Sequence, residues 1–285
     1  MTASPARSNP SHRSALPTRA ANLTLALSAT LAVLQGCGGV DLGLKPGATS
    51  VLQGLQGPSP EEAARMAIDP YDTNNRFKGI NILANLPFAS EDVYLKLFEK
   101  TASDPDSGVR AASIRALGIH GNPTHARLIV EKLNDRNDEV RRESARALQR
   151  IHDPVAMQPL LDHLAVGRES EPAVRVEVAT ALGQYGDPKV VEALIRALDD
   201  EYLAVNTAAL NSLRTLTGQD LSTDRLAWDR WYKQTVASAK NPFDARAPYL
   251  YPVFTRGKFW YENIPFFPPP PNETPSTPAG LPQGL

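Results

Sequence analysis

Residues 135–148 read DRNDEVRRESARAL, and the spacing within this stretch decides the fold. With the residues that follow, the pattern consists, in order, of Asp135, Val140, Arg141, Ala147, Leu148, Pro154 and Leu164. Its Val-Arg pair recurs at positions 109, 174 and, as Val-Asn, 205, so the spacings are 31, 34 and 31 residues. A repeat of this length indicates a solenoid, in which stacked units share one continuous core.

The sequence of each repeat unit predicts two helices. In the second full unit, Val140, Ser144, Ala147 and Leu148 fall on one helical face, and the other units place similar residues at the same offsets. Glycines are expected to end the first helices, and prolines are expected to begin the second helices. These glycines are Gly118, Gly121, Gly183 and Gly186, and the prolines are Pro123, Pro154 and Pro188.

The pattern D-x4-V-R-x5-A-L-x5-P-x9-L resembles a HEAT repeat of the short type called PBS-lyase HEAT-like. The resemblance covers about residues 70 to 217, with a degenerate first unit, and implies an all-α solenoid of about five helix pairs. It also implies a hydrogen-bonded ladder of Asp and Arg side chains with a structural role. The ladder residues are Asp104, Arg110, Asp135, Arg141 and Arg175, with Glu169 or Glu171 as the acidic residue of the third unit. Asn206 replaces the arginine of the fourth unit, so the ladder is expected to weaken there.

A capping helix is expected after the last repeat. Trp228, Trp231, Tyr232 and Val236 share one helical face, which suits a cover over the end of the core. The predicted solenoid with its cap spans residues 61–240.

The N-terminus resembles a bacterial lipoprotein signal peptide over residues 1–36. Arginines precede a short apolar stretch, which ends at Leu34-Gln35-Gly36-Cys37. Cys37 is the only cysteine of the chain and would become the lipidated first residue of the mature protein. Since Gly38 is not an aspartate, the enteric sorting rule favours the outer membrane over the inner one. Residues 37–60 are rich in Gly, Pro and Ser and predict a flexible tether.

The C-terminal residues 241–285 combine many prolines with many aromatic residues. Prolines favour extended segments and oppose helices. Three interpretations stay open: a strap that packs on the last helices, a partner-binding segment, or a membrane-interface element. The last would use Trp260, Tyr261, Phe266 and Phe267.

Charge and motifs exclude several function classes. The formal net charge is −1, with 30 basic and 31 acidic residues, whereas nucleic-acid binding needs a basic face. No phosphate-binding, nucleophile-elbow or metal-ligand spacing is present, and His120, His125, His152 and His163 are scattered. We therefore expect no catalytic residue, no metal and no cofactor.

The exposed column of the second helices offers mixed charges, which suit a protein or peptide partner. The candidate protein-binding residues are Arg127, Glu131, Gln158, Asp162, Glu192 and Arg196. The sequence thus predicts a lipid-anchored, non-catalytic interaction scaffold at the bacterial cell envelope. The alternatives are a structural envelope component assembled through its aromatic tail, and a HEAT-like lyase or chaperone acting on an exported protein.

Overall fold

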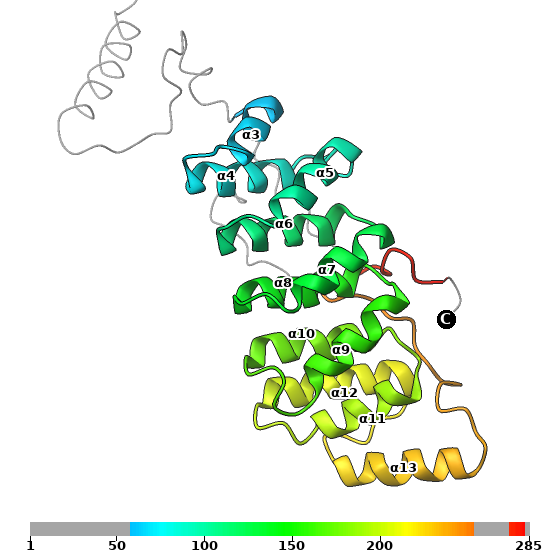
Figure 1. Ribbon diagram of the computed structural model, residues 1–285. Helices are drawn as coiled ribbons and strands as arrows, with labels where there is room; N and C mark the ends of the chain where they lie inside the picture. Colours follow the sequence, from blue (N-terminus) through cyan, green and yellow to red (C-terminus); the bar gives the residue numbers. More distant parts are fainter. Residues whose placement is uncertain (1–57, 254–273, 283–285) are drawn as a thin grey trace, which may run out of the picture. The chain divides into compact units, whose positions relative to one another are not determined.

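The computed structural model describes residues 58–253 and 274–282 of the chain, which are helical apart from turns and extended segments (Figure 1). The helices are α3 (Pro60–Ala67), α4 (Thr73–Ala84), α5 (Asp92–Thr101), α6 (Ser107–His120), α7 (Ala126–Lys132), α8 (Asp138–Arg150), α9 (Met157–Leu164), α10 (Pro172–Leu182), α11 (Pro188–Ala197), α12 (Leu203–Thr217) and α13 (Arg225–Ala237). Short 3₁₀ turns, Pro123–His125 and Pro154–Ala156, precede α7 and α9. The predicted lipidation site Cys37 and the aromatic residues 260, 261, 266 and 267 lie outside the described residues.

The helices stack as successive pairs. The first helices α4, α6, α8, α10 and α12 follow one another, each packed on the next (Figure 1). The second helices α5, α7, α9 and α11 pack on the first helix of the following unit. This arrangement confirms the predicted all-α solenoid of about five helix pairs, and α3 adds one helix before the first pair.

Local sequence explains where the helices begin and which face is buried. The Asp106 and Asn137 side chains cap α6 and α8 by accepting hydrogen bonds from the Val109 and Val140 amides. The first-helix core positions of the repeat have no exposed surface; they include Val109, Leu117, Val140, Leu148, Val174 and Leu182. Burial of such side chains contributes about 1.5–3 kcal/mol each, so the repeated apolar stripe is the main stabilising feature.

Gly118 corrects one expectation about the helix ends. It lies inside α6 and does not terminate it, whereas Gly121 and Gly183 do occupy C-cap positions. A Cβ atom at position 118 would lie 2.7 Å from the Ala147 Cβ on α8. Gly118 therefore allows α6 and α8 to approach closely.

The charged ladder runs along the edge where the first helices begin. Each arginine forms a two-pronged ion pair with the carboxylate of the following unit: Arg76 with Asp104, Arg110 with Asp135, Arg141 with Glu169 and Arg175 with Asp200. The pairing thus crosses between units, and the Asp104 and Arg110 side chains of one repeat motif do not pair with each other. Within its own unit each of these arginines donates to main-chain carbonyls, as Arg110 Nη1 does to Asp104 O at 2.9 Å, and Arg76 also donates to the Thr73 hydroxyl.

The ladder ends at Asn206, whose amide donates to Leu198 O and Asp200 O. Burial raises the pKa of Asp135, but hydrogen bonds from Arg110 and the Asn137 amide outweigh it and hold the pKa below its usual value. The pKa of Glu169 is lowered in the same way, by Arg141 and the Glu171 amide. The acidic ladder residue of the third unit is therefore Glu169, and Glu171 lies outside the ion pair.

Helix α13 covers the end of the solenoid. Trp228 is fully buried and its indole donates to Ser222 O at 2.8 Å, while Trp231 packs edge-on against it at 5.7 Å between ring centroids. Tyr232 is also buried, but Val236 is 54% exposed and lies outside the buried face.

The described part of the C-terminal tail forms a strap along the edge where the first helices end. Tyr249 is buried and its hydroxyl donates to Thr180 O at 3.1 Å. Arg246 donates to Gln184 O at 2.7 Å, and the Ala247 amide donates to Thr215 O at 2.8 Å. Of the three interpretations of the tail, the strap therefore describes residues 241–253.

Within the described ranges, none of the helices has both the length and the apolar character needed to cross a membrane.

Candidate functional site: a cleft between α9 and α11

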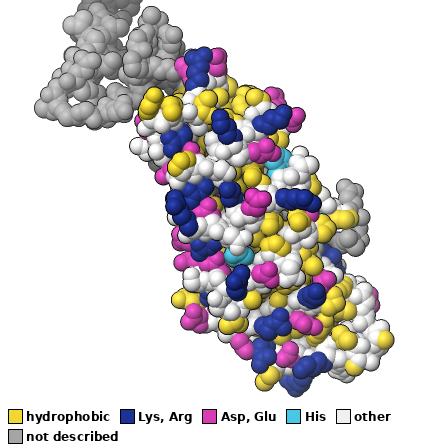
Figure 2. Space-filling model, in the orientation of Figure 1, with side chains coloured by type: hydrophobic (Ala, Val, Ile, Leu, Met, Phe, Trp, Pro, Cys, Tyr) yellow, Lys and Arg dark blue, Asp and Glu magenta, His cyan; other side chains and the backbone are white. Residues whose placement is uncertain are grey.

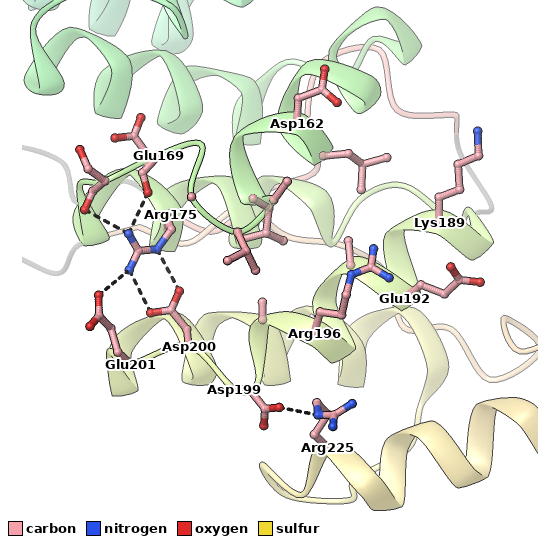
Figure 3. Close-up of a pocket in the computed structure, with 18 of the residues that line it drawn as sticks. Asp162, Glu169, Arg175, Lys189, Glu192, Arg196, Asp199, Asp200, Glu201 and Arg225 are labelled. Carbon is pink, nitrogen blue, oxygen red and sulfur yellow. Dashed lines mark hydrogen bonds and ion pairs between the residues drawn. The ribbon is translucent and has the colours of Figure 1, made fainter.

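All six candidate binding residues are exposed on the second helices. Arg127 and Glu131 lie on α7, and the other four line a cleft between α9 and α11 with a volume of about 920 Å³ (Figure 3). Those four are Gln158, Asp162, Glu192 and Arg196. Arg225, near the start of α13, and the α9–α10 loop also line the cleft. Its volume lies in the range of ligand-binding clefts, about 300–1,000 Å³.

A local lengthening of the repeat accompanies this cleft. The ladder carboxylate comes two residues after the last leucine of the second helix in the neighbouring units, as in Leu133 to Asp135. In the third unit Glu169 comes five residues after Leu164, which accounts for the single 34-residue spacing. The added residues form a loop with Val166 at 95% exposure and Gly167 at a φ of +77°. We infer that this longer α9–α10 connection forms one wall of the cleft.

Several charges in the cleft are already neutralised. Arg175 pairs with Asp200 at 2.9 Å and lies 3.9 Å from Glu201, and Arg225 pairs with Asp199 at 2.5 Å (Figure 3). Glu169 belongs to the ladder through Arg141. These groups hold the cleft's borders in place and are not available to a ligand without breaking an ion pair.

Other charges have no ionic partner. In the part of the chain that the structure describes, no ion pair is formed by Lys189, Glu192 or Arg196, which lie along one side of α11. Across the cleft, the Asp162 carboxylate accepts a hydrogen bond of 2.8 Å from the neutral Gln158 side chain, its one side-chain donor among the described residues. Figure 2 shows positive and negative side chains intermixed over the drawn face, without a patch of one sign.

The cleft also contains apolar surface. Leu161 and Leu164 on α9, Ala193 and Ala197 on α11, and Val166 in the loop contribute to its lining. Unpaired charges of both signs beside apolar lining residues suit a polypeptide segment better than a polyanion, because a polyanion would bring negative charge against Glu192 and Asp162.

A second polar network connects the first helices and was missed by sequence reasoning. Glu143 is 1% exposed and accepts from Arg115 at 3.0 Å, and Arg146 pairs with Glu177 at 2.6 Å. Gln149 also donates to Glu177 at 2.6 Å. The recurrence of Glu at 143 and 177 and of Arg at 115 and 146, at the repeat spacings, was the available signal. The network links α6, α8 and α10 and is structural.

The histidines occupy separate positions. His120 bonds the carbonyl of Ala84 at 2.7 Å, His125 lies 3.3 Å from Glu99, and His163 lies 3.6 Å from Glu169. His152 stacks on Tyr185 at 4.9 Å, and burial lowers the pKa of His152. Across the described ranges no group of three or more His, Cys, Asp or Glu side chains could hold a metal ion.

Comparison with known proteins identifies the repeat. The family described as HEAT repeats matches residues 94–170 and 165–227. The uncharacterized phycocyanin operon protein Z of Pseudanabaena tenuis is 28% identical over 149 residues, which is 48% of this chain and 73% of that protein.

Among solved structures, the CpcE–CpcF complex of phycocyanin lyase from Nostoc is similar with a TM-score of 0.51 and 18% identity, covering 70% of this chain and 76% of the matched chain. A designed armadillo repeat protein matches with a TM-score of 0.44 and 14% identity, covering 63% of this chain and 90% of that one. The structural likeness to the lyase subunit concerns the fold. With the family match and the stacked helix pairs, it shows that this chain carries a HEAT-like repeat domain.

Proposed function

We propose that this protein is a non-catalytic scaffold that binds a protein partner through the cleft between α9 and α11. The observation that carries the proposal is the set of unpaired charged side chains there, Lys189, Glu192, Arg196 and Asp162, around apolar lining residues. A partner segment with an apolar side chain between a basic and an acidic one would pair with the unpaired charges of the cleft and cover its apolar lining. Such complementarity supplies specificity and speeds association.

Charge reversal tests this proposal. The protein is purified from its native cells under mild conditions, and the co-purifying proteins are quantified by mass spectrometry. Arg196→Glu is expected to lose the specific partner. The matched control is Arg230→Glu, which reverses an exposed arginine on α13 that does not line the cleft. Equal recovery of every co-purifying protein from both variants would refute the cleft as the binding site.

We further propose that the scaffold is lipid-anchored through Cys37 at the cell envelope, with the outer membrane favoured. The lipobox-like Leu34-Gln35-Gly36-Cys37 supports this proposal. Cys37→Ser should move the protein from the membrane to the soluble fraction, because the acyl chains supply the membrane affinity. Unchanged membrane partitioning of this variant would contradict the anchor.

One relative favours a second candidate, a lyase-type role acting on another protein. The 28% identical protein is named for a phycocyanin operon, although its own function is uncharacterized. Incubating the full chain with a bilin and a candidate acceptor protein distinguishes the two. Covalent chromophore transfer that depends on this chain would support the lyase, and its absence together with stable partner binding would support the scaffold.

A further inference from the structure

The last described segment, residues 274–282, packs against the end of α8, far from it in sequence. The His152 amide donates to Ala279 O at 2.8 Å, and the Ala279 amide donates to Arg150 O at 2.8 Å. Ile151 and Ala279 thereby form a parallel β-bridge. Main-chain pairing of this kind is how proteins hold extended peptides at an exposed edge.

Only a glycine can occupy position 280, next to this bridge. Gly280 has a φ of +86°, and a Cβ atom there would lie 2.5 Å from Pro123 Cγ and 2.7 Å from His152 O. Pro278, on the other side of Ala279, is buried. The end of α8 and the turn at Pro123 thus form a surface in close contact with the backbone of Pro278-Ala279-Gly280, and we call this surface the groove.

This contact is weaker than the one made by the strap. Tyr249 of the strap is 4% exposed, whereas all residues from 274 to 282 except Pro278 and Leu281 are exposed. One further contact holds the segment: the Tyr251 amide donates to Ser276 O at 3.1 Å, and Tyr251 itself is held by the Arg150 guanidinium, 4.8 Å from the centre of its ring. Segments with few buried contacts open locally without global unfolding.

We propose that the groove formed by Pro123, Arg150, Ile151 and His152 is a peptide-binding site for an extended Pro-Ala-Gly segment, occupied in cis by residues 278–280. Because residues 278–280 belong to the same chain as the groove, their binding is intramolecular, so even a weak intrinsic affinity keeps the groove filled. The site is separate from the α9–α11 cleft, and its ligand is recognised by backbone pairing and by the glycine.

Amide hydrogen exchange on the full chain tests occupancy of the groove. Ala279→Pro removes the donor to Arg150 O, and Gly280→Ala introduces both backbone strain and a clash. Either change is expected to speed exchange of the His152 amide by about tenfold or more. The Ala247 amide, which reports on the strap, should keep its exchange rate and verify that each variant is folded. Gly167→Ala is the matched control, because Gly167 also has a positive φ but has no atom within 4 Å of an added Cβ. Unchanged His152 exchange in both variants would overturn the proposal.

Binding in trans tests the groove as a site of its own. The probe is a fluorescent synthetic peptide of residues 274–282. It should bind the full-length Gly280→Ala variant, slow the exchange of the His152 amide again, and bind the unaltered chain at least about tenfold more weakly, because that chain's groove is filled. A peptide with Ala in place of Gly280 should not bind. Failure of the unaltered peptide to bind the opened variant, or equal binding of both peptides, would refute the proposed site.

Discussion

The ion-pair ladder gives the sharpest stability prediction, at the rung between Arg110 and Asp135. Arg110 Nε and Nη2 donate to the two Asp135 oxygens at 2.8 and 2.7 Å, and the two side chains are 7% and 10% exposed. Arg110→Ala would leave the Asp135 carboxylate with only the Asn137 amide as a hydrogen-bond donor, at 2.9 Å. Removing one partner of a buried ion pair costs about 3–5 kcal/mol, because the other charge stays desolvated.

The assay is urea unfolding followed by circular dichroism, applied to Arg110→Ala, Asp135→Ala and the double variant. We expect each single change to lower the free energy of unfolding by about 3 kcal/mol or more. The double variant should lose less than the sum, with a coupling of about 1–3 kcal/mol. Arg65→Ala is the control, since Arg65 and Glu61 form an ion pair that is 75% and 77% exposed; its cost should be below about 1 kcal/mol. If Arg110→Ala costs no more than Arg65→Ala, the buried ion pair between Arg110 and Asp135 contributes no more to stability than an exposed one.

Three further predictions follow from the packing and the charges. Gly118→Val should destabilise the protein by about 1–3 kcal/mol in urea unfolding, because an added Cβ would lie 2.7 Å from Ala147 Cβ and 2.8 Å from Ala147 Cα; unchanged stability would contradict the close approach of α6 and α8. The pKa values of Asp135 and Glu169 are lower in the folded protein than the values of about 3.9 and 4.3 expected in the unfolded chain. The stability that these two carboxylates contribute is therefore fully present above the unfolded-state pKa values and is lost as the pH falls through the folded-state pKa values. Acid titrations of unfolding should therefore show a stability loss below about pH 4.5 that is smaller in Arg110→Ala, and an identical loss would count against the ladder's role. Tyr249→Ala should lower stability by about 3–5 kcal/mol and release the strap to limited proteolysis, and unchanged resistance would show that the strap does not depend on this buried ring.

The fold was predictable because one period repeats through the middle of the chain. Hydrophobic spacing placed Val140, Ala147 and Leu148 on one buried stripe, and a stripe that cannot be buried within one unit requires stacking. The residue types of the ladder could also be predicted from the sequence. Their pairing was not, because a consensus within one unit does not show that Arg110 reaches across to the carboxylate of the next unit.

Sequence reasoning chose the exposed second-helix column but could not place the cleft. The extra residues between Leu164 and Glu169 were visible as an irregular spacing, yet their effect depends on how α9 and α11 pack. The Gly118 assignment failed for a related reason: a glycine near a helix end predicts a terminus locally, whereas the close approach of Ala147 is a tertiary constraint. In the tail, the prolines favoured an extended, unpacked segment, whereas the aromatic residues favoured packing on the solenoid. The position of residues 246–249 depends on hydrogen bonds to carbonyl groups near the ends of α10 and α12, which the sequence of the tail does not show.

The most direct test of the scaffold is site-specific photocrosslinking in intact native cells. A photoreactive residue at position 192 faces the cleft, and one at Thr207, exposed on the first-helix side, serves as the control. If the cleft binds a partner, position 192 should give a saturable crosslink to one defined protein, and this crosslink should be absent from position 207 and lost with Arg196→Glu. Identical, non-saturable crosslinks from both positions would contradict a partner-binding cleft between α9 and α11.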